Sequence, residues 1–162
     1  MTNKIIKLLL LFITAIIVQL VVVPLISISG VGPNIIVILL VYFTLMNGQM
    51  FGTVLGFICG FALDLISGNV FGVSMLSLTI SGFITGYFYN EPKVEVTTSS
   101  FFFVFIVFLC ASIESFVFNA VSSTNPEFNF LFLLVEGAIL PGIFTAALSV
   151  FKIIFIKRKR FE

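Results

Sequence analysis

Histidine and tryptophan are absent from this sequence of 162 residues, and only 9% of its residues are charged. Without histidine, the chain lacks the commonest general base and the commonest metal ligand of proteins. Soluble domains carry about 25% charged residues, so a chain with this little charge and 60% hydrophobic residues is not expected to be a soluble globule. Its long apolar runs instead predict an all-α polytopic membrane protein, because about 20 helical residues cross the hydrocarbon core of a bilayer.

Cysteines and enzyme motifs are also scarce. Cys59 and Cys110 each lie within an apolar run and form no CxxC pair, which favours small buried side chains over a disulfide or a metal site. The sequence contains no HExxH, GxSxG, P-loop or GxGxxG motif. An intramembrane aspartyl mechanism would need two aspartates, and Asp64 is the only one. We therefore expect no catalysis, no cofactor and no metal.

Apolar stretches predict six transmembrane helices in a single integral membrane domain spanning residues 1–162. Their approximate ranges are 5–26, 33–46, 50–66, 70–89, 101–121 and 130–156. The first run exceeds the apolar core of a signal peptide, so we expect it to remain as an uncleaved helix. The second and third are short, which leaves both a full hairpin and a re-entrant one open.

Prolines predict several boundaries. Pro33 suits the first turn of the second helix, where a missing N–H is tolerated. Pro92 excludes a continuous helix through residues 90–100, which we predict to be a polar loop. Pro141 and Gly142 predict a kink in the last helix.

Basic residues predict the orientation. With six crossings, every lysine and arginine falls on one side of the membrane, which identifies that side as the cytoplasm. Both termini are then cytoplasmic. The only basic cluster ends a hydrophobic helix, so it predicts contact with anionic lipid headgroups and not with nucleic acid. Its residues are Lys157, Arg158, Lys159 and Arg160.

Glycines recur every four residues along residues 48–72, except at position 64, where Asp64 stands, and this spacing places residues on one face of a helix. Gly52, Gly56 and Gly60 form the part of this series that lies within one predicted helix, and Gly82 and Gly86 form a second pair in the next. Small residues at this spacing let membrane helices approach closely. The pattern predicts a packing surface, either within the chain or shared with another chain.

Four polar side chains interrupt the predicted helices: Gln19, Asp64, Glu114 and Glu136. Counted along each helix, all four lie at a similar depth, about 21 Å from the cytoplasmic end. No basic residue shares this depth. Three interpretations stay open: acids that lock helices together by pairing with a helix N-terminus or a hydroxyl, a docking site for a partner, and a small-molecule or proton site.

Two segments carry a family resemblance. PNIIVILLVYF begins at Pro33, and GTVLGFICGFALDLISGNVFGVSML follows from Gly52, with a further GxxxG in the next helix. This combination resembles the bacterial rod shape-determining protein MreD family. Its motif positions here include Pro33, Asn34, Asp64, Gly68 and Gly72. Many family members carry an acid where this chain has Asn34, so a charge at that position is not expected.

The resemblance implies a non-catalytic scaffold of the cell-elongation complex in the cytoplasmic membrane. Its implied partner is a bitopic MreC-like protein, with indirect links to an MreB-like filament, RodA and a class B penicillin-binding protein. The family is also similar in fold to the six-helix S components of energy-coupling-factor importers, so a vitamin-binding S component is the alternative function. Those proteins carry AxxxA motifs on their first helix, whereas Ala15 stands alone here in FITAIIVQLVVV.

Overall fold

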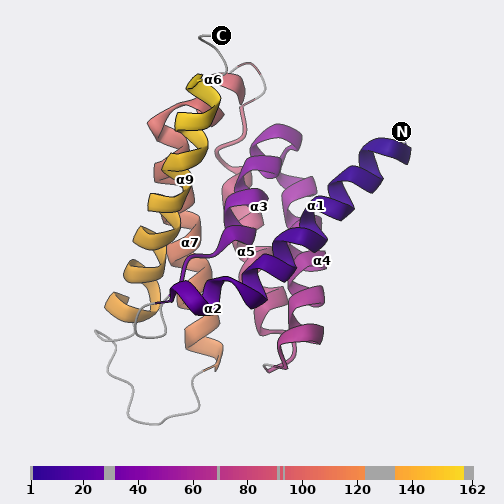
Figure 1. The fold of residues 1–162 in the computed structure, drawn as a ribbon, viewed down its shortest axis with the longest axis vertical. Coiled ribbons are helices and arrows are strands. Elements are labelled where there is room, and N and C mark those ends of the chain that lie inside the picture. The colour runs from indigo at the N-terminus through magenta and orange to yellow at the C-terminus, as the bar shows by residue number, and fades with distance from the viewer. Residues whose placement is uncertain are drawn as a thin grey trace.

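The structure is a computed structural model, and it describes residues 2–27, 32–68, 70–90, 92, 94–122 and 134–158. Within these residues the chain is helical and contains no strand. Figure 1 shows the arrangement of the elements. In chain order they are α1 (Thr2–Val21), α2 (Val23–Ile26), α3 (Ile35–Asn47), α4 (Gln49–Ser67), α5 (Val73–Gly86), α6 (Val94–Ser99), α7 (Phe101–Ser122), the π-helical turn η2 (Val135–Ile139) and α9 (Leu140–Arg158).

Two of the described helices, α4 and α7, are long and apolar enough to cross a membrane. Four shorter apolar helical stretches accompany them, at Leu10–Val21, Ile35–Asn47, Val73–Gly86 and Val135–Phe151. These six stretches fall within the six ranges expected from the sequence, apart from one or two residues at the ends of the second, third and fifth.

The first predicted helix is divided in the structure. Helix α1 ends at Val21, and the short α2 follows from Val23 to Ile26. Pro24 explains the division, because it has no N–H to donate to the carbonyl of the residue four positions earlier. The prediction of one helix over residues 5–26 was therefore wrong at its C-terminal end.

Helix α3 begins two residues later than expected. Asn34 is its N-cap: it has an extended backbone (φ −103°, ψ 97°), and its side chain accepts a hydrogen bond from the backbone N–H of Val37. Pro33 thus precedes the cap and does not occupy the first turn. At the other end Gly48, with φ +94°, joins α3 directly to α4. A residue with a side chain rarely adopts this conformation, so glycine is required at the tight turn.

The second half of the chain corrects two further expectations. Residues 94–99, predicted to be loop, form the helix α6, because proline prevents a helix from continuing through it but not from starting two residues later. The irregularity expected at Pro141 lies one turn earlier, in η2. Proline has no N–H for the carbonyl of Gly137, four residues before it, and the Asn119 side chain of α7 donates to that carbonyl instead, at 2.9 Å.

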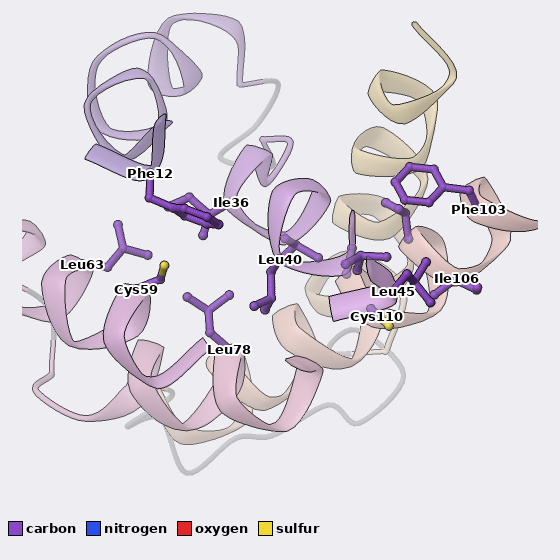
Figure 2. Packing of buried hydrophobic residues seen from close by; sticks show 14 of the residues in the cluster. Phe12, Ile36, Leu40, Leu45, Cys59, Leu63, Leu78, Phe103, Ile106 and Cys110 are labelled. Atoms are coloured by element: carbon purple, nitrogen blue, oxygen red, sulfur yellow. The ribbon is translucent and has the colours of Figure 1, made fainter. Parts of the chain in front are cut away.

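Helix α3 lies in the middle of the molecule and carries much of its apolar core. Figure 2 shows this core, in which side chains from α1, α4, α5 and α7 surround those of α3. The α3 side chains are almost completely buried, with exposed fractions of 0–1% at Ile36, Val37, Leu40, Val41 and Leu45. The outward faces of the other helices are rich in exposed large hydrophobic side chains, as expected where lipid replaces water.

Candidate functional site

The glycines of α4 lie directly against the backbone of α5. A Cβ atom added to Gly60 would come within 2.5 Å of the Met75 Cα, and one added to Gly56 would overlap the backbone carbonyl of Leu78. Side-chain carbons do not approach other atoms this closely. Any larger residue at either position must therefore push the two helices apart.

The facing glycines of α5 make reciprocal contacts with α4. Gly82 lies against the backbone carbonyl of Gly52, and a Cβ added to Gly86 would come within 2.5 Å of the Gln49 Cα. The Gln49 side chain also donates a hydrogen bond to the Phe83 carbonyl, at 3.1 Å. On its other side Gly52 contacts Thr44 of α3. These contacts within the chain occupy the glycine surface that the sequence indicated.

Asp64 caps the N-terminus of α5. Its Oδ2 accepts hydrogen bonds from the backbone N–H groups of Gly72 (2.9 Å) and Met75 (3.1 Å), and its Oδ1 accepts one from Ser74 (3.1 Å). These N–H groups have no partner within the helix, and the positive end of the helix dipole lies beside them. The carboxylate is only 3% exposed, so the helix N-terminus supplies the compensation that a basic residue would otherwise provide.

Glu114 of α7 is also buried, with an exposed fraction of 6%. The Ser77 hydroxyl of α5 donates to its Oε1 and the Ser115 hydroxyl to its Oε2, each at 3.3 Å. The Asn34 side chain is a third hydrogen-bond partner. Glu114 therefore joins α7 to α5 and to the start of α3.

Side chains of α9 and α1 bond to the backbone at Asn34 and at its two neighbours. The Asn34 backbone N–H donates to the Thr145 hydroxyl of α9, at 3.0 Å. The Gln19 side chain of α1 bonds to the two neighbouring residues: Oε1 accepts from the Ile35 N–H at 2.8 Å, and Nε2 donates to the Pro33 carbonyl at 3.2 Å. The start of α3 is thus tied to α1, α7 and α9.

A serine pair on α5 connects the two acids. The Ser77 hydroxyl lies 3.3 Å from both the Ser74 carbonyl and Glu114 Oε1, and the Ser74 N–H donates to Asp64. We call the resulting set the buried polar network. Its members are Gln19, Asn34, Asp64, Ser74, Ser77, Glu114, Ser115 and Thr145.

The structure brings three of the four predicted polar side chains into this network and leaves one outside. Glu136 lies in η2 and is exposed. The two buried acids contact helix N–H groups or hydroxyls, as the first of the three interpretations described. With both carboxylates enclosed, Glu136 is the acid of this set that another molecule can reach directly.

The sequence reasoning missed the hydroxyl members of the network. The signal was present in α5, where Ser74, Ser77, Ser81 and Thr85 recur at helical spacing and are all buried. The last two contact Cys110 of α7: Ser81 donates to its carbonyl at 3.3 Å, and the Thr85 hydroxyl lies 3.1 Å from its Sγ. Helix α5 therefore presents glycines to α4 and hydroxyls to α7.

The remaining predicted site residues contribute no side chain to the network, although the backbones of Gly72 and Pro33 bond to Asp64 and Gln19. Gly68 (φ +67°) ends α4 and Gly72 (φ +97°) precedes α5, both in the left-handed region. Lys157 and Arg158 fall in the last turn of α9, and the two basic residues after them lie outside the described part of the chain. Within that part, no group of three or more His, Cys, Asp or Glu side chains is placed to hold a metal ion.

Comparison with known proteins places these features in a family. No curated protein and no solved structure matches the chain. A family model described as rod shape-determining protein MreD matches residues 1–93, which is more than half of the 162 residues. The matched range contains the glycine contacts of α4 and α5 and the network members from α1 to α5. The chain therefore belongs to the rod shape-determining protein MreD family.

Proposed function

We propose that this protein is a non-catalytic scaffold subunit of the bacterial cell-elongation complex. In this proposal it crosses the cytoplasmic membrane six times, with both termini in the cytoplasm and a fold similar to that of importer S components. It docks a bitopic MreC-like protein and acts indirectly on an MreB-like filament, RodA and a class B penicillin-binding protein. Family membership supports the role in rod shape determination.

The buried polar network is the observation that carries the scaffold role. Its two carboxylates are enclosed and hydrogen-bonded to other groups of the chain. Buried polar networks whose members are hydrogen-bonded make a protein interior rigid and fix the arrangement of its elements. The same fact counts against the importer alternative, because the interior acids that a polar ligand would need already have partners.

Glu136 is our candidate for direct partner contact. It is exposed on η2, and the Asn119 bond to Gly137 fixes the neighbouring backbone against α7. An exposed carboxylate at a membrane helix end suits a basic residue beside the transmembrane segment of a partner. Asp64 and Gly56, by contrast, would affect partner binding indirectly, because they hold α4 and α5 together.

Co-purification of the tagged MreC-like partner from membranes tests this assignment. Glu136→Gln removes the exposed charge and should lower partner recovery while the protein keeps its thermal stability in detergent. Glu136→Asp keeps the charge at the same position and serves as the matched control, with recovery expected to stay close to that of the unmodified protein. Asp64→Leu should lower recovery and stability together, because it removes the cap of α5.

Unchanged recovery with both Glu136→Gln and Asp64→Leu would refute the assignment of these residues. Detection of a bound vitamin in the purified protein, or co-purification with an ATPase pair, would favour the importer alternative over the scaffold.

A further inference from the structure

The two buried acids of the polar network have different surroundings. Asp64 accepts hydrogen bonds from three backbone N–H groups at the positive end of α5. Glu114 is almost as enclosed, but its hydrogen-bond partners within the described residues are the hydroxyls of Ser77 and Ser115 and the side chain of Asn34. All three partners are uncharged side chains. The backbone donors that stabilise an ionised carboxylate at Asp64 are therefore not found at Glu114.

The start of α3 lies next to Glu114, but its N–H groups are used by other acceptors. The Asn34 N–H donates to the Thr145 hydroxyl, and the Ile35 N–H donates to the Gln19 side chain. The Val37 N–H donates to the Asn34 side chain. Helix α3 therefore does not cap Glu114 in the way that α5 is capped by Asp64.

Basic side chains do not compensate Glu114 either. Helix α7 packs against α3, α5, α6, α9 and η2, and α5 contains no ionisable residue. The first basic residue on these helices, Lys152, follows Thr145 by seven residues, about 10 Å along the axis of α9. A buried carboxylate without a counter-charge is costly, and a proton removes the charge. The ionisable residues of α7 itself and of these neighbouring helices are Cys110, Tyr42, Glu95, Glu136, Lys152, Lys157 and Arg158.

The Ser77 hydroxyl gives a separate argument, based on counting protons. Its oxygen lies 3.3 Å from Glu114 Oε1 and also 3.3 Å from the Ser74 carbonyl oxygen. A hydroxyl has one proton to donate and can accept two hydrogen bonds, so with an ionised Glu114 it can serve only one of these oxygens. With a proton on Oε1, Glu114 donates to Ser77 and Ser77 donates to the Ser74 carbonyl. Both contacts are then hydrogen bonds.

The distances agree with a neutral acid. A hydroxyl that donates to an ionised carboxylate typically lies about 2.5–2.7 Å from it. The Ser77 and Ser115 hydroxyls both lie 3.3 Å from the Glu114 oxygens. Neither hydroxyl is drawn in as it would be by a full negative charge.

We propose that Glu114 is a proton-binding site, whose carboxyl is protonated in the folded protein at neutral pH and donates a hydrogen bond to the Ser77 hydroxyl. The proton allows α3, α5 and α7 to meet around an acid without any counter-charge from another molecule. A basic group of a partner would therefore find its acid at the exposed Glu136 and not at Glu114. The protonation of Glu114 itself does not depend on the scaffold role.

Infrared spectroscopy of the full-length protein, in a detergent without ester groups at neutral pH, tests the proposal. A protonated carboxyl has a carbonyl band at higher frequency than the bands of amides and ionised carboxylates. Glu114→Gln should remove one such band, which in the unmodified protein shifts to lower frequency in D₂O. Glu136→Gln makes the same substitution at the exposed acid and should leave the band in place. Loss of ionised-carboxylate bands in Glu114→Gln, with the protonated region unchanged, would overturn the proposal.

Stability provides a second readout that separates the two buried acids. Glu114→Gln exchanges one neutral group for another of similar size, so the folding equilibrium constant should fall by less than about tenfold, as for one neutral hydrogen bond. Asp64→Asn removes an ionised group that accepts three N–H bonds, and the constant should fall by about thirtyfold. Denaturant titration in detergent measures both. A loss in Glu114→Gln as large as that in Asp64→Asn, or a failure of Glu114→Gln to fold, would show that the charge is required and would overturn the proposal.

Discussion

The interfaces α4–α5 and α7–α9 join neighbouring helices in opposite ways. Along α4–α5, glycines on both helices bring backbone against backbone at several successive turns. Along α7–α9, close contact is seen at Gly142, and aromatic and alanine side chains then line an open groove. The first interface has no room for an extra atom, whereas the second leaves a groove of about 470 Å³. The same membrane protein thus combines a tightly packed pair of helices with an adaptable pair.

Gly60→Leu should break the tight interface and produce the largest effect. Its Cβ would meet the Met75 Cα at 2.5 Å. Neither atom can move without moving its helix backbone, so the two helices must separate. We expect the free energy of unfolding to fall by about 3 kcal/mol, the upper end of the usual overpacking cost. Denaturant titration in detergent measures it. Stability close to that of the unmodified protein would show that α4 and α5 can slide without cost.

Asp64→Asn should weaken the same pair of helices through its cap. The side chain keeps its size but loses its charge, and its NH₂ group then faces N–H donors of α5 that the carboxylate had accepted. Hydrogen bonds to charged groups contribute about 1.5–3 kcal/mol, so we expect a loss of about 2 kcal/mol in the same titration. Val70→Ala controls for disturbance of this turn, since the Val70 side chain lies in the same connection and is 59% exposed. Equal losses in both variants would assign the effect to the turn and not to the cap.

Ser77→Ala should have a smaller effect on the contact between α5 and α7. It removes the hydroxyl that bonds to Glu114, and a typical hydrogen bond contributes about 1 kcal/mol. A double-mutant cycle with Glu114→Gln isolates the pair, and couplings in membrane interiors average about 0.6 kcal/mol. Strict additivity of the two substitutions would mean that the serine and the acid stabilise the fold independently.

Ala147→Phe should have the smallest effect on stability and sharpens the contrast with Gly60→Leu. Both substitutions add a large side chain at a helix–helix boundary, but position 147 borders the open groove. We expect a change within about 0.5 kcal/mol, as for exposed sites, in the same denaturant titration. A loss comparable to that of Gly60→Leu would show that α7 and α9 are as tightly constrained as α4 and α5.

The glycine face of α4 was predictable from sequence, but neither its partner helix nor most of the polar network was. Spacing alone places Gly52, Gly56 and Gly60 on one face, because helical periodicity is a local property. The partners of Glu114 come from α3, α5 and α7, and their meeting depends on how distant helices dock. Helix spacing could have indicated the hydroxyl row from Ser74 to Thr85, but not which helix it would face.

The helix boundaries also differ in whether a nearby residue or a side chain from another helix determines them. The start of α3 depends on the cap formed by Asn34, a residue type that favours this position, so local chemistry indicated the correct boundary even though Pro33 was preferred. The π-helical turn before Pro141 was harder to predict from the sequence. It depends on a side chain of α7, Asn119, that satisfies the Gly137 carbonyl from another part of the chain.

Gln19 links the order of synthesis to the order of folding. The ribosome makes α1 before residues 33–35, yet those residues supply both hydrogen-bond partners of the Gln19 amide. An amide in the hydrocarbon core is costly until it finds partners. In the folded structure the start of α3 satisfies an amide that α1 alone would leave exposed to hydrocarbon, so docking of α3 onto α1 also removes a cost of placing α1 in the membrane.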